Sequence, residues 1–274
     1  MKSVAFLTSQ ELAALTDDDR LAIPELEARG ARVSPLVWTD ARAAEDARAF
    51  DLVVVRSPWD WQTAPARFAA VLDAIPRLEN RSASKWLDKR YLLELAARGV
   101  RTIPTEVIAA PEKVAECKYP RAVLKPALGA GGHRTFSFAA AEWPRVAAAA
   151  GAGPFLLQPF VEEVETEGEW SLVFFDGVYS HAVRKRAARG EFRVHVEWGG
   201  SVEIATPPAS FVDEARRVLD AAGETFLFAR VDGIPTRAGF VLTELEVVEP
   251  ELFLRAHPDA PARFADAVAT RLAE

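Results

Sequence analysis

Alternating runs of apolar and polar positions divide the chain into three parts. In the first third, short apolar runs alternate with amphipathic stretches. This order predicts a parallel sheet covered by helices, because parallel strands need long connections that are usually helical. The predicted strands of this part are 4–8, 32–38 and 52–56, and its predicted helices are 21–29 and 65–75.

The middle third predicts a smaller α+β unit. A helical segment over 81–99 leads into it, with Asp88 as a candidate cap and Gly99 as its stop. A loop rich in glycine, 127–135, follows the first strand of the unit. The predicted strands are 122–126, 135–138 and 155–161, and the predicted helix is 142–150.

The last third predicts antiparallel strands. Asp176-Gly177 separates two alternating segments within 169–183, which is a strong hairpin signal. A second pair of strands, 226–232 and 242–250, is joined by a turn within 233–239. The predicted helices of this part are 207–222 and 261–272.

Three carboxylates fall on the second pair of strands. Period-two alternation puts Glu244 and Glu246 on one face of their strand, and a turn centred near Ala238 places Asp232 opposite Glu244. A magnesium ion would relieve their mutual repulsion, because Mg²⁺ takes hard oxygen ligands and joins carboxylates to substrate phosphates. The alternative interpretation is a solvated strand face that carries scattered acids.

The composition excludes several classes of protein. The chain has 274 residues and a formal net charge of −7, which argues against a nucleic-acid partner. It has no apolar run of about 18 residues for a membrane span, and its first apolar stretch is too short for a signal peptide. Cys117 is the only cysteine and the histidines show no zinc-ligand spacing, so we expect a reducing, cytoplasmic compartment and no zinc site.

Lysine is rare beside arginine, so the positions of the lysines are informative. Lys125 interrupts an apolar strand directly before the glycine-rich loop, whose exposed amides are suited to cradling phosphates. Lys89 follows the candidate cap Asp88 and so falls in what would be the first turn of the helix, where a bound phosphate would offset its repulsion by the helix dipole. For Lys89, a solvated side chain explains the pattern equally well.

Two further polar clusters allow a functional and a structural interpretation. Residues 56–61 (Arg-Ser-Pro-Trp-Asp-Trp) follow the third parallel strand, at the end where such sheets bind ligands. They form either a substrate site or a surface turn with packed tryptophans.

A basic run, Arg184-Lys185-Arg186 continuing to Arg193 and His195, supplies the positive charge that phosphoryl transfer needs. The alternative for this run is a solvated loop.

The order of these parts resembles that of the ATP-grasp superfamily. The shared parts are a lysine at a helix start, a strand lysine before a glycine loop, a hinge strand, an arginine–lysine cluster and the Asp…Glu-x-Glu acids. The resemblance covers almost the whole chain. Within the superfamily, the segments that look like the branch containing the D-cycloserine-forming cyclic ligase are 56–61, 88–92, 176–182 and 244–250.

The resemblance implies a role for each candidate site residue. Those expected to bind ATP are Lys89, Lys125, Gly131, Gly132, Gln158, Phe160, Val161 and Glu165. Asp232, Glu244 and Glu246 are expected to bind two magnesium ions, with Mn²⁺ as an alternative. Glu246 stands where many members of the superfamily have asparagine. Those expected to stabilise the transferred phosphoryl group and the acyl phosphate are Arg184, Lys185 and Arg193. Those expected to orient the substrate are Arg56, Ser57, Trp59 and Asp60.

The resemblance also implies an ATP-grasp fold of combined α/β and α+β class, in three units. The expected units are an N-terminal parallel α/β (pre-ATP-grasp) substrate domain over 1–80, a helical linker with a small α+β lid over 81–158, and a C-terminal antiparallel-sheet catalytic domain over 159–274.

The implied activity is a Mg-ATP-dependent ligase. It would activate a small amino-acid carboxylate as an acyl phosphate and couple it to an amine, within one molecule if the substrate is O-ureido-D-serine. The alternatives are an intermolecular ligase acting on another amino acid or peptide, a kinase or phosphotransferase on the same fold, and a nucleotide-binding module without catalysis. The expected partners are a small amino-acid-like molecule and, by analogy with relatives, a second copy of the chain.

Overall fold

The computed structural model describes residues 1–194 and 196–274, so His195 of the predicted basic run lies outside the described residues. The strands are β1 (Lys2–Thr8), β2 (Ala31–Val37), β3 (Leu52–Ser57), β4 (Leu78–Glu79), β5 (Glu106–Ile108), β6 (Arg121–Pro126), β7 (Phe136–Ala139), β8 (Phe155–Pro159), β9 (Glu169–Phe175), β10 (Val178–Arg186), β11 (Ser201–Ile204), β12 (Phe228–Thr236) and β13 (Gly239–Glu246).

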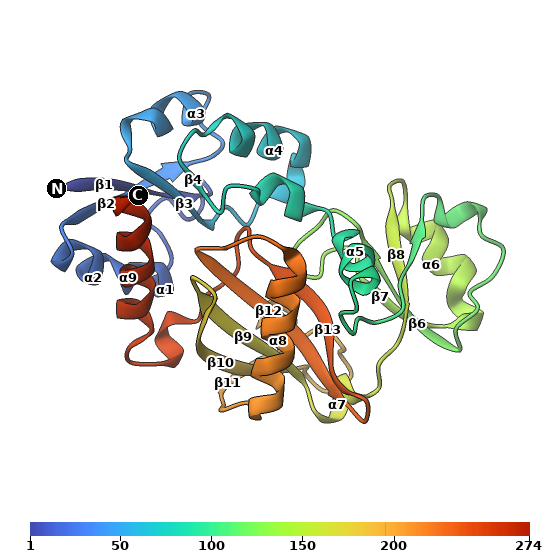
Figure 1. Ribbon diagram of the computed structural model, residues 1–274. Helices are drawn as coiled ribbons and strands as arrows, with labels where there is room; N and C mark the ends of the chain where they lie inside the picture. Colours follow the sequence, from blue (N-terminus) through green and yellow to red (C-terminus); the bar gives the residue numbers. More distant parts are fainter. Residues whose placement is uncertain (195) are drawn as a thin grey trace.

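These strands form three sheets (Figure 1). The N-terminal sheet has the order β2-β1-β3-β4 and is parallel. The central sheet, β11-β10-β9-β12-β13, and the small sheet, β5-β8-β6-β7, are antiparallel. A parallel sheet joined to two antiparallel sheets is the predicted combination of α/β and α+β parts.

Short helices connect and cover the sheets. The α-helices are α1 (Asp17–Arg20), α2 (Ala22–Ala28), α3 (Ala43–Asp46), α4 (Pro65–Ala74), α5 (Tyr91–Ala97), α6 (Trp143–Ala150), α7 (Glu163–Thr166), α8 (Ala209–Ala222) and α9 (Ala260–Ala273). The 3-10 helices are η1 (Ala47–Ala49), η2 (Trp61–Thr63), η3 (Ala83–Leu87), η4 (Pro111–Lys113), η5 (Ala140–Glu142), η6 (Val196–Trp198) and η7 (Leu254–Ala256). Within 1–194 and 196–274, none of these helices has both the length and the apolar character to cross a membrane.

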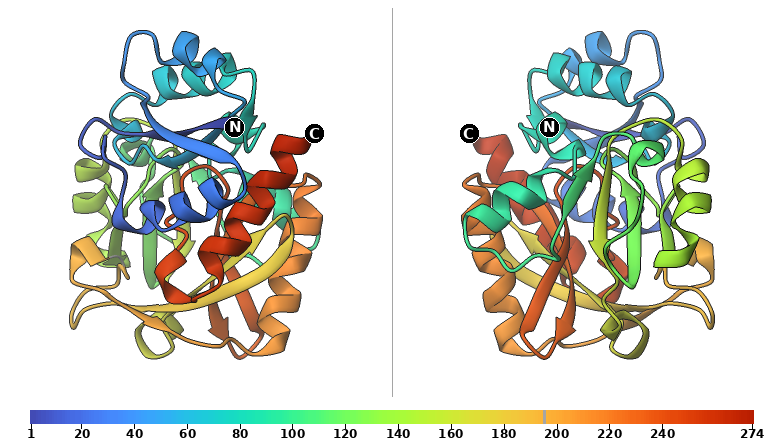
Figure 2. Two further views of the ribbon diagram at one scale, coloured as in Figure 1. Left: turned by 90° about the vertical axis from the view of Figure 1, so that its left-hand side faces the viewer. Right: turned by 90° about the vertical axis from the view of Figure 1, so that its right-hand side faces the viewer.

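Period-two alternation explains how the N-terminal sheet is covered on both faces. Val4 and Phe6 of β1 belong to the same core cluster as Phe264 of α9, and α9 lies beside α2 against that face (Figure 2). Ala5 and Leu7 point the other way, into the cluster that includes Phe68 of α4. The last helix of the chain therefore completes the core of the first sheet.

The other two sheets are each covered by one main helix. Ala215 and Val218 of α8 share a core with Leu242 and Leu245 of β13. The small sheet packs on α6 in a separate cluster that contains Val146. The small sheet and α6 form the lid-like part of the molecule, beyond β13 in Figure 1.

The prediction of one helix over 81–99 is wrong. The segment contains η3 and α5, and the backbone of Asp88 between them is extended. Asp88 forms a bridge with Leu128 of the glycine-rich loop, and the backbone N–H of Lys89 donates to the carbonyl of Ala127 at 2.8 Å. A continuous helix would need these same backbone groups. The break brings Lys89 next to the loop that follows Lys125.

The antiparallel turns agree with the sequence patterns. β9 and β10 form a hairpin around Asp176-Gly177, and Gly177 has a φ of +75°, a conformation that glycine adopts readily. β12 and β13 are joined through Ala238, and Asp232 is in register with Glu244 as predicted. β12 is longer than predicted, because it continues to Thr236.

Candidate active site

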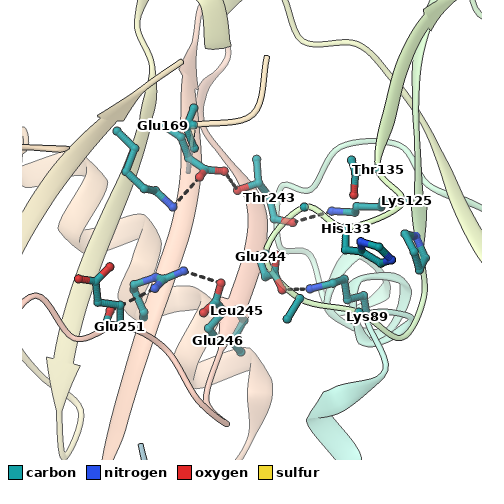
Figure 3. A pocket seen from close by; sticks show the side chains of 18 of the residues that line it. Lys89, Lys125, His133, Thr135, Glu169, Thr243, Glu244, Leu245, Glu246 and Glu251 are labelled. Carbon is teal, nitrogen blue, oxygen red and sulfur yellow. Dashed lines mark hydrogen bonds and ion pairs between the residues drawn. The ribbon is translucent and has the colours of Figure 1, made fainter. Parts of the chain in front are cut away.

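A cavity of about 750 Å³ lies where the three sheets approach one another, and Figure 3 shows part of its lining. Its walls come from β6, β8, β10, β12 and β13, from the glycine-rich loop and from the chain after β3. The predicted site residues that line it are Trp59, Lys89, Lys125, Gly131, Gly132, Gln158, Phe160, Val161, Lys185, Glu244 and Glu246.

Lys89 and Lys125 bring two ammonium groups to the cavity (Figure 3). Lys89 forms an ion pair with Glu244, whereas the Nζ of Lys125 donates to the carbonyl oxygen of Thr243 at 3.3 Å. Burial and the charge of Lys89 lower the pKa of Lys125 to about 7. Within the described part of the chain Lys125 has no carboxylate partner, so an incoming anion such as phosphate would stabilise its charge.

Each predicted metal-binding acid is held by a cation. Asp232 accepts hydrogen bonds from Lys185 and Arg230, both at 2.9 Å, and Glu246 accepts one from Arg230. Among residues 1–194 and 196–274, no three Asp, Glu, His or Cys side chains gather closely enough to hold a metal ion. Asp232 is not part of the cavity wall, whereas Glu244 and Glu246 are.

The electrostatics of these acids fit a divalent cation. Burial opposes ionisation of Asp232, but Arg230 and Lys185 hold its pKa well below the ordinary value. Burial raises the pKa of Glu246; Arg230 opposes this rise and the charge of Asp232 adds to it. A Mg²⁺ ion beside Glu244 and Glu246 would meet the hard oxygen donors that it prefers and would add to the positive charge that Arg230 brings to Glu246.

Strand alternation separates the members of the basic run. Lys185 is 4% exposed and also pairs with Glu169 at 2.7 Å. Its neighbour Arg184 points to the other face of β10, pairs with Glu203 of β11 and does not line the cavity. Of these two neighbours, the structure therefore places Lys185 at the cavity and Arg184 away from it, because adjacent residues of a strand point to opposite faces.

Arg193 and Glu165 also lie off the cavity wall. Arg193 pairs with Glu191 at 2.6 Å, and its guanidinium lies 3.3 Å from the ring centre of Trp198. The indole of Trp198 donates to the carbonyl of Gly131 at 3.0 Å, so Arg193 braces the glycine-rich loop from outside. Glu165 pairs with Arg121 at 2.7 Å, away from the predicted ribose contact.

Arg56 and Ser57 do not reach the cavity. Arg56 is 1% exposed; it donates to Asp19 at 2.9 Å and to the carbonyl oxygen of Pro250 at 3.2 Å. Ser57 is fully buried against Thr8. The structure gives no support to the prediction that both orient the substrate, because their polar atoms bond within the protein and neither residue lines the cavity. Asp60 likewise accepts from the Trp38 indole at 2.6 Å and does not line the cavity.

We expect Arg56→Met to destabilise the fold by about 3–5 kcal/mol, because it leaves Asp19 as an unpaired buried charge. The double variant Arg56→Met/Asp19→Asn should recover part of this loss, since neither charge remains. Urea unfolding measures both. If the Arg56→Met protein were stable and its KM were strongly raised, this result would instead indicate that Arg56 contacts the substrate.

Sequence patterns missed several side chains of the site. Arg230 holds both Asp232 and Glu246, and its signal was an arginine two residues before an acid on a buried strand. The hydroxyl oxygen of Tyr91 accepts a hydrogen bond from the backbone N–H of Leu245 at 3.0 Å. Glu249 accepts from the indole of Trp61, and burial together with the charge of Glu246 raises its pKa to about 7.

The three-sheet fold and a cavity that combines lysines with acids on paired strands define an ATP-grasp ligase. Residues 4–81 match the family model described as the N-terminal domain of D-cycloserine synthetase DcsG. The cycloserine biosynthesis protein DcsG of Streptomyces lavendulae is 33% identical over 275 residues, covering 86% of this chain and 87% of that protein. The chain belongs to the D-cycloserine synthetase DcsG family.

Solved structures agree with this assignment. The crystal structure of D-cycloserine synthetase DcsG has a TM-score of 0.81 and 28% identity, covering 98% of this chain and 99% of that chain. D-alanine–D-alanine ligase from Bacillus anthracis has a TM-score of 0.69 and 13% identity, covering 100% and 98%, and shares the fold. The protein is thus an ATP-dependent carboxylate–amine ligase, which forms C–N bonds, and the predicted fold and enzyme class are confirmed.

Proposed function

We propose that the protein activates the carboxylate of O-ureido-D-serine with Mg-ATP and couples it to the oxygen-bound nitrogen of the same molecule. Hydrolysis then removes the carbamoyl group from that nitrogen as carbon dioxide and ammonia, giving D-cycloserine. The observation that carries this proposal is the single cavity that brings Lys89, Lys125 and Lys185 to Glu244 and Glu246, in a chain related to DcsG along 86% of its length. The cavity volume of about 750 Å³ is within the range typical of small-molecule sites, which supports binding of a nucleotide together with a small amino-acid-like substrate.

In this proposal, the small sheet and its loop bind the nucleotide. Lys89 and Lys125 hold the phosphates, and Gly131 and Gly132 cover them. Both glycines have positive φ, +60° and +68°, so the loop takes a shape that other residues adopt at a cost. The adenine lies along Gln158, Phe160 and Val161 at the end of β8.

Glu244 and Glu246 would hold Mg²⁺, with Asp232 behind them as the third acid. The ion would supply positive charge for phosphoryl transfer. Lys89 and Arg230 pair with these acids in the structure and would have to give them up when the ion binds. The same proposal includes a second metal ion and Mn²⁺ as a substitute for Mg²⁺. It divides the chain into three functional units, 1–80, 81–158 and 159–274. It also includes a homodimer, a cytoplasmic location and the lack of a nucleic-acid partner.

The chemistry needs charge and positioning rather than a side-chain nucleophile. A carboxylate is a poor electrophile until phosphorylation turns it into an acyl phosphate; the nitrogen then attacks the carbonyl carbon, loses a proton and displaces phosphate. Lys185 stabilises the phosphoryl oxygens from a position fixed by Asp232 and Glu169. The contact between Trp198 and Gly131 supports loop closure, which protects the acyl phosphate from water.

A turnover assay tests this function. The protein is incubated with Mg-ATP and O-ureido-D-serine, and nucleotide products and D-cycloserine are followed together. ADP with D-cycloserine in equal amounts is the expected result. ADP with a stable phosphorylated product would favour a kinase, and ADP without a cyclised product would indicate an intermolecular ligase. Formation of AMP would overturn the acyl-phosphate mechanism.

We expect ATP binding to take up a proton through Lys125. Its pKa of about 7 leaves the free side chain mostly neutral at about pH 8 and mostly charged at about pH 6, and bound phosphate restores the ammonium form. Uptake measured by calorimetry in two buffers of different ionisation enthalpy should therefore approach one proton at the higher pH and fall towards zero at the lower. Lys125→Met is the control and should abolish the difference; pH-independent uptake would contradict the assignment.

A further inference from the structure

The cavity wall contains one carboxylate without a cation among the described residues. Five glutamates line the cavity, and four of them pair with a lysine or an arginine: Glu169 with Lys185, Glu244 with Lys89, Glu246 with Arg230 and Glu251 with Arg255. The fifth, Glu249, forms no such pair within 1–194 and 196–274; its side chain accepts from the neutral indole N–H of Trp61. A half-buried carboxylate in that position is stabilised if a cation arrives with a ligand.

The position of Glu249 is fixed from both sides. The indole N–H of Trp59 donates to its backbone carbonyl at 3.0 Å, and Arg56 donates to the carbonyl of the next residue, Pro250, at 3.2 Å. The second carboxylate oxygen has no hydrogen-bond donor in the described part of the chain, and it is not among the buried atoms there that lack a partner. One oxygen of a rigidly held carboxylate therefore faces the cavity.

We propose that Glu249, positioned by the indoles of Trp59 and Trp61, binds the ammonium group of the amino-acid substrate. The inference rests on the proposed function and specifies its substrate class as a carboxylic acid that carries a cationic amine. The carboxylate supplies the charge-assisted hydrogen bond that an ammonium group prefers, and the indole N–H groups of Trp59 and Trp61 hold residue 249 in place. A single carboxylate suits Mg²⁺ poorly, because that ion needs several oxygen ligands.

The order of residues along the chain agrees with this assignment. Thr243 lies beside Lys125, Glu244 and Glu246 follow on β13, and Glu249 comes three residues after the strand ends. Strand residues advance by about 3.3 Å each. Thr243, which lies beside Lys125 at the proposed phosphate end, is therefore about 10 Å from Glu246, the last residue of β13. A small amino acid bound at Glu249 would extend its carboxylate back towards the acids and the transferred phosphate.

The test compares O-ureido-D-serine with its des-amino analogue, 3-(ureidooxy)propionate, in wild type, Glu249→Gln and Glu251→Gln. We expect wild type to prefer the amino acid by about 10- to 100-fold in kcat/KM, as a charge-assisted hydrogen bond would give. Glu249→Gln should lose most of this preference, mainly through KM, while Glu251→Gln keeps it. Initial ADP release measures the preference, and thermal unfolding checks that the variants fold.

Binding without turnover separates this inference from the proposed function. Calorimetric titration of both compounds into the three proteins, with Mg²⁺ and a non-hydrolysable ATP analogue, should show the same loss of preference in Glu249→Gln. Absence of ADP with a retained binding difference overturns the proposed function and leaves the ammonium site in place. Equal weakening of both compounds by Glu249→Gln, or an unchanged preference, overturns the ammonium site.

Discussion

Lys185→Met is expected to lower turnover by about 10²-fold or more and to destabilise the protein at the same time. Lys185 is the cavity-facing member of the basic run, so its loss removes one fixed positive charge from the transferred phosphoryl group. It also leaves Asp232, which is 2% exposed, with Arg230 as its remaining cation. Breaking a buried pair costs about 3–5 kcal/mol. Steady-state ADP release and urea unfolding measure the two effects separately.

Arg184→Met is the matched control, because it removes a cation from the neighbouring position on the opposite face of β10. Arg184 pairs with the partly exposed Glu203, and exposed pairs contribute about 0–1 kcal/mol. Turnover should stay within about twofold of wild type. If Arg184→Met lowered turnover as much as Lys185→Met while both proteins stayed folded, the assignment of faces on β10 would be wrong.

Glu244→Gln is expected to lower turnover by about 10²–10³-fold, since a metal ligand contributes several kcal/mol of transition-state charge stabilisation. The amide keeps the shape of the side chain but removes the charge that a metal ion and Lys89 both need. The metal dependence should change as well: half-maximal activity should require a much higher Mg²⁺ concentration. A magnesium titration of ADP release checks this.

The matched control for this variant is Glu203→Gln. Glu203 also lies on a strand of the central sheet and pairs with an arginine, but it does not line the cavity. It should leave the magnesium dependence unchanged. Magnesium-dependent activity that is unaltered in Glu244→Gln would remove Glu244 from the metal site.

Local patterns predicted much of this fold because they act over short distances. Alternation placed Glu244 and Glu246 on one face, and the turn residues fixed the register that pairs Asp232 with Glu244. The Asp176-Gly177 hairpin followed from its own two residues. The helix over 81–99 was wrong because the extended backbone at Asp88 is stabilised by Leu128, which is distant in sequence.

The site was predicted less well because function depends on what lies behind each side chain. The sequence pattern around an arginine at the end of a parallel strand does not distinguish one that faces a ligand from one that faces a buried aspartate. Arg56 faces Asp19. Similarly, a run of three basic residues does not show which of them a strand turns inward, although alternation limits the answer to one face. Arg230 and Glu249 became recognisable only when their partners on other elements were known.

The packing of α9 against β1 has a consequence for the synthesis of the protein. Phe6 of β1 remains without Phe264 while the intervening chain is being made, because α9 spans Ala260–Ala273. The ribosome makes about 5–20 residues per second, so the part of this apolar face that α9 covers stays exposed for many seconds, although α2 already packs on the same face. A fragment ending near residue 81, where the matched N-terminal family domain ends, would carry that part permanently exposed and should aggregate. Early protection by a chaperone, rather than early folding, is the expected fate of the first strands to leave the ribosome.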